Sequence, residues 1–240
     1  MKKLIVIACA LLALSATASA QFMNSGASTS TSKNSGAAAW ISNDHADVFN
    51  TFSFTYSPMN IDGWSGNIED DGLNALSLTW TQARNVMASQ PLYVEYGVGA
   101  QWSFWSDSES DGDMEVSSSL NFLSLKVPVS VMYLVSVPNT QITLAPYLGL
   151  NLTGYLLGQQ KISMEYEGES ESRSSSCFSK DDMGGEPYNR FGLGWHIGAR
   201  VGFGKYFFNI GYEGPITNLY KSGSYEVSTN QVNISLGLTF

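Results

Sequence analysis

Apolar and polar residues alternate along the chain from about residue 48 onward, with a period of two. The clearest run is 92–104, where every even position is apolar and Glu95, Gly97, Gly99 and Gln101 lie at odd positions. Such alternation predicts a β-strand with one apolar face. Seven further runs share the pattern, at 52–56, 76–80, 123–131, 142–153, 190–201, 208–213 and 233–240.

The connections between these runs alternate in length and charge. Those after the second, fourth and sixth runs are short, around 85–90, 136–139 and 204–205. The other connections are long and hold most of the carboxylates. Short turns on one side and long loops on the other are typical of outer-membrane barrels. The pattern predicts an all-β fold over 48–240: an eight-stranded antiparallel transmembrane β-barrel, an up-and-down meander with acidic extracellular loops.

The pattern leaves open which face of the barrel points inward. In a soluble barrel such as a lipocalin the apolar face surrounds a ligand, whereas in a membrane barrel it faces lipid. Glycines crowd the polar face, which suits the inside of a small barrel. Large aromatic residues lie near the strand ends on the face assigned as apolar, as an interfacial girdle would. These observations favour the membrane barrel; the aromatic residues are Trp80, Trp102, Trp105, Trp195, Tyr212 and Phe240.

The first 47 residues predict two segments outside the barrel. Residues 1–20 combine two lysines, an apolar core and Ala18-Ser19-Ala20, which is the pattern of a cleaved signal peptide. Residues 21–47 are rich in Ser, Thr, Ala and Gly and predict a disordered periplasmic tail. Cys177 is then the one cysteine left, so no internal disulfide is expected.

The chain carries 12 basic and 21 acidic residues, a formal net charge of −9. An acidic protein repels nucleic acid phosphates, so no nucleic acid partner is expected.

Several motifs resemble those of a known family. The run Pro91-Leu-Tyr-Val-Glu-Tyr-Gly-Val-Gly-Ala-Gln-Trp-Ser-Phe104, the segments 125–129 and 145–151, and the closing strand resemble small outer-membrane barrels of the porin family, of the OmpX and OmpA membrane-domain type. The resemblance implies a location in the outer membrane, surrounded by its lipid and lipopolysaccharide. It also implies that the terminal Phe240 is the assembly signal read by the barrel-assembly machinery. It carries over no catalytic residues.

Five ionisable residues fall on the polar face and form a candidate lumen network: Glu95, Lys126, His196, Arg200 and Glu213. If Gly204-Lys205 is a two-residue turn, His196 pairs with Glu213 and Arg200 with Asn209. A side-chain network that fills a narrow lumen is the favoured interpretation, since unpaired charges there are costly. A proton-sensitive or ion-guiding constellation is the alternative.

The segment 107–113 supplies weak candidate ligands for divalent cations, with a merely solvated acidic loop as the favoured interpretation. An EF-hand is excluded, because Ser118 occupies the twelfth position where a glutamate is required. No phosphate loop or nucleophile elbow occurs, so neither an enzyme nor a cofactor is predicted. The candidate cation ligands are Asp107, Glu109, Asp111 and Asp113.

The sequence therefore predicts a structural or surface-interaction barrel with a filled lumen. A narrow channel for small solutes or cations is the alternative. The ligand of the acidic loops is left open.

Overall fold

The structure, a computed structural model, describes residues 46–62, 72–87, 89–111, 114–138, 140–166, 169–179, 188–222 and 225–240. The expected signal peptide and all of the expected tail before residue 46 lie outside these described residues. Among the described residues, no helix is long and apolar enough to cross a membrane.

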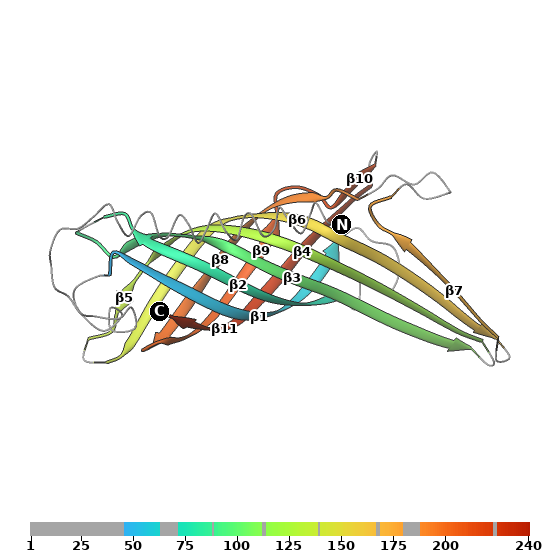
Figure 1. Cartoon of the computed structure of the whole chain (residues 1–240), viewed down its shortest axis with the longest axis horizontal. Coiled ribbons are helices and arrows are strands. Elements are labelled where there is room, and N and C mark those ends of the chain that lie inside the picture. Colours follow the sequence, from blue (N-terminus) through green and yellow to red (C-terminus); the bar gives the residue numbers. More distant parts are fainter. Residues whose placement is uncertain are drawn as a thin grey trace. The chain divides into compact units, whose positions relative to one another are not determined.

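Eight long strands form a closed antiparallel ring in the order β1-β2-β3-β4-β6-β8-β9-β11, and β11 pairs back with β1 (Figure 1). Consecutive strands of the ring are neighbours throughout, which confirms the predicted eight-stranded meander. Three short strands, β5 (Val135–Ser136), β7 (Glu169–Ser176) and β10 (Tyr220–Ser222), attach to it. The ring strands are β1 (Val48–Asp62), β2 (Leu73–Asn85), β3 (Leu92–Asp111), β4 (Met114–Tyr133), β6 (Ile142–Tyr166), β8 (Phe191–Phe203), β9 (Tyr206–Pro215) and β11 (Tyr225–Thr239).

The β8–β9 connection is the two-residue turn that the sequence predicts. Phe203 pairs with Tyr206 across it, and Gly204 has a φ of 60°. Tight hairpin turns require a positive φ that glycine adopts at little cost. The predicted register follows from this turn, with His196 opposite Glu213 and Arg200 opposite Asn209.

The two faces of the ring have opposite chemistry. Large apolar side chains on the outward face are exposed, including Leu148 at 63%, Leu150 at 50% and Leu236 at 66%. Inward side chains such as Gln101 and Ser130 are polar and buried. A soluble barrel would have these faces reversed. The apolar outward belt is matched by lipid, so the chain is a membrane-spanning β-barrel.

The belt ends within one outward pair on three adjacent strands, since Leu123 pairs with Leu157 and Phe104 lies opposite Asn121. Its last outward apolar residues there are Phe104, Leu123 and Leu157, and the next outward residues are Ser106, Asn121 and Gln159. On β4 the belt runs from Leu123 to Tyr133. That length agrees with the roughly 9–11 residues that a tilted strand needs to cross a bilayer.

Three ring strands continue well past the belt, and this corrects the predicted loops. Asp107–Asp111 belongs to β3 and pairs with 114–118 of β4, which in turn pairs with 162–166 of β6. β7 joins the outer edge of β6, so the four strands project together beyond the others (Figure 1). The carboxylates here alternate with serines, so this segment carries the period-two signal of a strand. High polarity led to its prediction as a loop.

Trp105 is a second correction. Its odd position places it inward, where it is buried, so it belongs to no outward girdle.

Two apolar clusters fill the barrel at its opposite ends. The turn-end cluster lies beside the short turns, and the loop-end cluster lies beside the long connections. The turn-end cluster consists of Phe49, Ala83, Tyr93, Met132 and Ala145. The loop-end cluster consists of Met59, Ile61, Leu73, Ala75, Trp105, Leu120, Phe122, Cys177, Leu219 and Val227.

A charge placed in the belt tests the lipid-facing assignment. We expect Leu150→Arg to lower the free energy of unfolding in lipid vesicles by about 2–4 kcal/mol, because a cation near the bilayer midplane is poorly solvated. Urea titration followed by gel mobility measures the change. Ser163→Arg, on the same strand beyond the belt, is the matched control and should cost little; equal effects would contradict the assignment.

Candidate functional site

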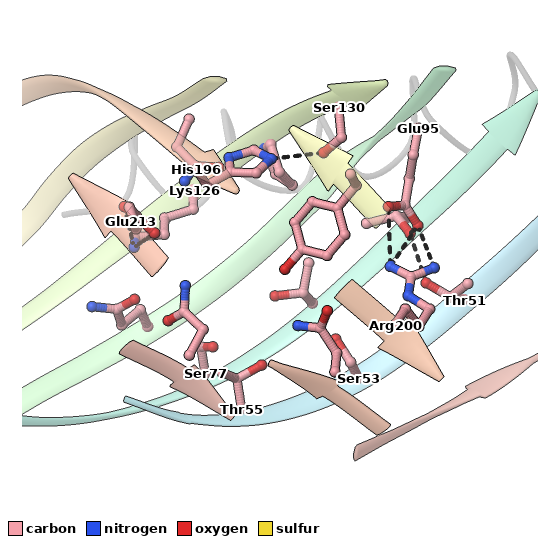
Figure 2. A pocket seen from close by; sticks show the side chains of 18 of the residues that line it. Thr51, Ser53, Thr55, Ser77, Glu95, Lys126, Ser130, His196, Arg200 and Glu213 are labelled. Atoms are coloured by element: carbon pink, nitrogen blue, oxygen red, sulfur yellow. Dashed lines mark hydrogen bonds and ion pairs between the residues drawn. The ribbon is translucent and has the colours of Figure 1, made fainter. Parts of the chain in front are cut away.

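The candidate site is the polar middle of the barrel, between the two apolar clusters. Inward positions on all eight ring strands face a cavity of about 120 Å³ (Figure 2). Because side chains alternate along a strand, each strand contributes every second residue to this space. All five ionisable residues predicted for the lumen line the cavity.

Glu95 and Arg200 form an ion pair across the lumen, from β3 to β8. Both Arg200 Nη atoms donate to Glu95 Oε1 at 3.1 Å, and Nη2 also donates to Oε2 at 3.0 Å. The Thr81 hydroxyl donates to Oε1 at 2.6 Å, and the guanidinium lies 4.5 Å from the Phe207 ring centroid. The pair is almost fully buried and multiply hydrogen-bonded, which offsets part of the cost of removing both charges from water.

Lys126 and Glu213 form a second ion pair, nearer the loop end. Lys126 Nζ donates to both carboxylate oxygens of Glu213, at 2.8 and 2.9 Å. Gln231 Nε2 donates to Glu213 Oε2 at 3.0 Å, and Gln101 Nε2 donates in turn to Gln231 Oε1. Two carboxylates are therefore matched by two cations within the lumen.

His196 lies between the two ion pairs. Its Nε2 is 2.7 Å from Ser130 Oγ, and its ring centroid is 5.8 Å from that of Tyr147 (Figure 2). A catalytic Ser–His pair needs a carboxylate that orients the other ring nitrogen. No side chain among the described residues hydrogen-bonds His196 Nδ1. His196 therefore packs among the other side chains that line the cavity.

The register prediction is right, yet the side-chain partners differ from those that register suggests. His196 and Glu213 are opposite on paired strands, but His196 contacts Ser130 and Glu213 contacts Lys126. Both ion pairs join strands that are not neighbours in the ring. In a narrow barrel, long side chains can reach across to the opposite wall. Strand pairing alone does not predict such contacts.

Two glycines make room for Tyr147, whose ring lies over the neighbouring strands β8 and β9 inside the barrel. Gly198 and Gly211 are paired on β8 and β9, and a Cβ at either position would clash with the Tyr147 hydroxyl. The small residues on the polar face therefore set how closely inward side chains can pack.

The candidate cation ligands lie on the projecting strands, away from the lumen. Asp107, Glu109 and Asp111 occupy alternate positions of β3, while Asp113 falls outside the described residues. Among the residues that the structure describes, no three His, Cys, Asp or Glu side chains cluster as metal ligands would.

Cys177 is buried in the loop-end cluster. Burial raises the pKa of the Cys177 thiol to about 11. Desolvation of the thiolate is the leading cause.

The Glu95–Arg200 pair yields a stability prediction. We expect Arg200→Ala to lower the free energy of unfolding by about 3–5 kcal/mol, because Glu95 would be left buried without its cation. The double variant Glu95→Gln with Arg200→Ala should recover much of this loss. Urea titration in vesicles measures both, with Lys205→Ala at the exposed turn as the control. Additive losses would contradict coupling across the lumen.

The buried thiol yields a pH prediction. Because the pKa of the Cys177 thiol is higher in the folded state than in the unfolded state, the protonated thiol adds to the free energy of unfolding. This contribution is complete below pH 9 and is lost as the pH rises through about 11. We expect alkylation of folded protein to be slow at pH 8 and to accelerate only towards pH 11. Protein unfolded in urea should react readily from about pH 9; identical profiles would place the thiol at the surface.

No family model and no curated protein matches this chain. Solved structures do. Ail, the attachment invasion locus protein of Yersinia pestis, has 14% identity and a TM-score of 0.38, over 81% of this chain and 100% of that chain. Neisserial surface protein A has 11% identity and a TM-score of 0.38, over 81% and 98%. The N-terminal β-barrel domain of Pseudomonas aeruginosa OprF has 11% identity and a TM-score of 0.28, over 79% and 97%. The similarity is one of fold, and it is with small outer-membrane β-barrels.

Proposed function

We propose that the protein is an integral outer-membrane barrel with a closed lumen that acts through its structure and its projecting surface. The observation that carries the proposal is the position of the polar cavity between two apolar clusters. Buried side chains of Phe49, Tyr93 and Met132 close the turn end, and those of Trp105, Leu120 and Phe122 close the loop end. Hydrated ions cross such apolar constrictions only at high cost.

The charges of the lumen also favour a packed interior. Glu95 with Arg200 and Lys126 with Glu213 leave no net charge among these four groups. These four groups therefore do not form a row of like charges of the kind that lines ion-selective pores. Eight-stranded barrels have interiors that side chains can fill, which agrees with this reading.

The surface role rests on the sheet that projects beyond the belt. β3, β4, β6 and β7 carry it, and it presents several carboxylates together with the exposed side chains of Met164 and Tyr166. On the proposed orientation this sheet lies outside the cell. Outer-membrane lipid and lipopolysaccharide then surround its base.

The C-terminal residue supports the proposed assembly route. Phe240 exchanges backbone hydrogen bonds with Asn50, at 2.9 and 3.0 Å, and its side chain is exposed at the turn end of the belt. We propose that the barrel-assembly machinery reads this closing strand before β11 pairs with β1.

A narrow pore for small solutes or cations is the second candidate. The polar cavity itself favours it, since its lining includes four charged residues and space for several waters. Conduction would require both apolar clusters to open. A structural barrel needs no such rearrangement.

Planar-bilayer conductance separates these candidates. We expect the folded wild-type protein to be silent, because each cluster by itself blocks the path. Trp105→Ala with Phe122→Ala, which thins the loop-end cluster, should also stay silent. Adding Phe49→Ala and Met132→Ala at the turn end should produce steady current steps.

Heat-dependent gel migration confirms folding of every variant before it is measured. Steady steps from the wild type, altered by Glu213→Gln, would overturn the closed barrel and establish the pore.

A further inference from the structure

The projecting sheet has an outward face that continues the lipid-facing belt. Above the belt, the outward positions are 106–110 of β3, 115–121 of β4, 159–165 of β6 and 170–176 of β7, taken at every second residue. Two thirds of the positions on this outer sheet face are serines. Its serines are Ser106, Ser108, Ser110, Ser117, Ser119, Ser163, Ser170, Ser172, Ser174 and Ser176.

Charge is divided between the two faces of the projecting sheet. Asp107, Glu109, Glu169 and Glu171 all have inward parity. On the outer sheet face, the carboxylates are Glu115 and its cross-strand partner Glu165, in the row far from the belt. The rows next to the belt therefore carry no carboxylate on this side.

The opposite side of the barrel differs in this respect. There the outward positions of β1 and β11 above the belt include Asp62 and Glu226. Among the described residues, the rows next to the belt on β3, β4, β6 and β7 thus differ from β1 and β11 in having no outward carboxylate. The chain has a net charge of −9, so a surface without carboxylates repels an anion less than the acidic surfaces do.

Lys161 is the one cation on the outer sheet face among the described residues. It is exposed, lies between Ser119 and Ser174 in the strand pairing, and has no ion-pair partner in the described part of the chain. It follows Leu157 by four residues, or about 13 Å along the strand, which with the usual strand tilt is about 10 Å above the belt. The polar layer of a bilayer is about 5–8 Å thick on each side, and the sugar head group of a glycolipid extends beyond that layer towards the level of Lys161.

A groove of about 390 Å³ lies at this level. Its walls come from Ser106, Ser108, Ser117, Ser119, Lys161 and Ser163, together with the inward-parity residues Asp107 and Ser118. Asp107, of inward parity, is the one carboxylate in this lining, and the Lys161 ammonium with the serine hydroxyls suits a phosphate attached to a sugar. The ammonium offers charge-assisted hydrogen bonds to phosphate oxygens, and the hydroxyls can donate to or accept from the sugar.

We propose that this groove docks the phosphorylated sugar head group of an outer-leaflet glycolipid. The proposal rests on the proposed outer-membrane orientation. Continuity favours this occupant: the same strands that contact acyl chains up to Leu157 present the groove directly above them. A lipid whose chains lie along the belt therefore carries its head group to Lys161, and its charge complements the lysine.

Titration of the full-length folded protein in detergent micelles tests the proposal. The probes are a diphosphorylated lipid A, the same lipid without phosphates, and inorganic phosphate as competitor, with bound lipid counted by native mass spectrometry. We expect the wild type to bind the diphosphorylated lipid roughly tenfold more tightly than the dephosphorylated one. Lys161→Glu should abolish this preference.

Two further variants make the test specific. Lys205→Glu makes the same charge change at the turn end and should keep the preference. The double variant Ser117→Ala with Ser119→Ala should weaken the binding of both lipids several-fold. It should leave the preference for the diphosphorylated lipid unchanged. A preference that survives Lys161→Glu, or none in the wild type, would overturn the proposal. Competition by millimolar inorganic phosphate would show that the site recognises phosphate alone, which would also overturn it.

Gel migration and conductance of the same samples distinguish the two proposals. A folded, silent barrel without the lipid preference would remove the docking site and leave the closed barrel intact.

Discussion

Closure of the strand ring is the constraint on which the rest of the molecule depends. In the hydrocarbon core no water is present to satisfy backbone N–H and C=O groups, so each must find a partner within the chain. Pairing of β1 with β11, together with the short turns, meets this requirement for all eight strands. Once the ring is closed, the parity of each position decides whether its side chain meets lipid or the lumen.

The closed ring in turn dictates the chemistry of the interior. Polar side chains inside a narrow barrel are cut off from bulk water, so each charge needs a partner nearby. The structure provides one through Glu95 with Arg200 and through Lys126 with Glu213, each spanning the lumen. These pairs tie non-adjacent strands together in the space between the two apolar clusters. On the proposed function, the packing that stabilises the barrel also keeps ions from passing.

Beyond the belt the constraint is relaxed, and the strands use their two faces differently. The inward face of the projecting sheet gathers carboxylates with Ile162, Met164 and Tyr166, while the outward face keeps serines and Lys161. Both faces are now open to water, so burial no longer determines which residues occupy them. The different charge of the two faces therefore indicates that they contact different surroundings.

The sequence by itself determined the strands of the belt, their order and the β8–β9 register. Alternation over 92–104 and the glycine of the Gly204-Lys205 turn are local signals, and each follows from backbone geometry. It also assigned Glu95, Lys126, His196, Arg200 and Glu213 to the polar face, because period two needs no knowledge of neighbours. Local polarity misled the prediction where strands continue beyond the belt, as at 107–111, where serines and carboxylates alternate in a strand.

The tertiary structure alone decided which of those residues meet. Arg200 reaches Glu95 and Lys126 reaches Glu213 because closing the ring sets the distance between opposite walls, which no single strand encodes. Trp105 and Cys177 are buried for the same reason: their neighbours in the loop-end cluster come from distant parts of the chain.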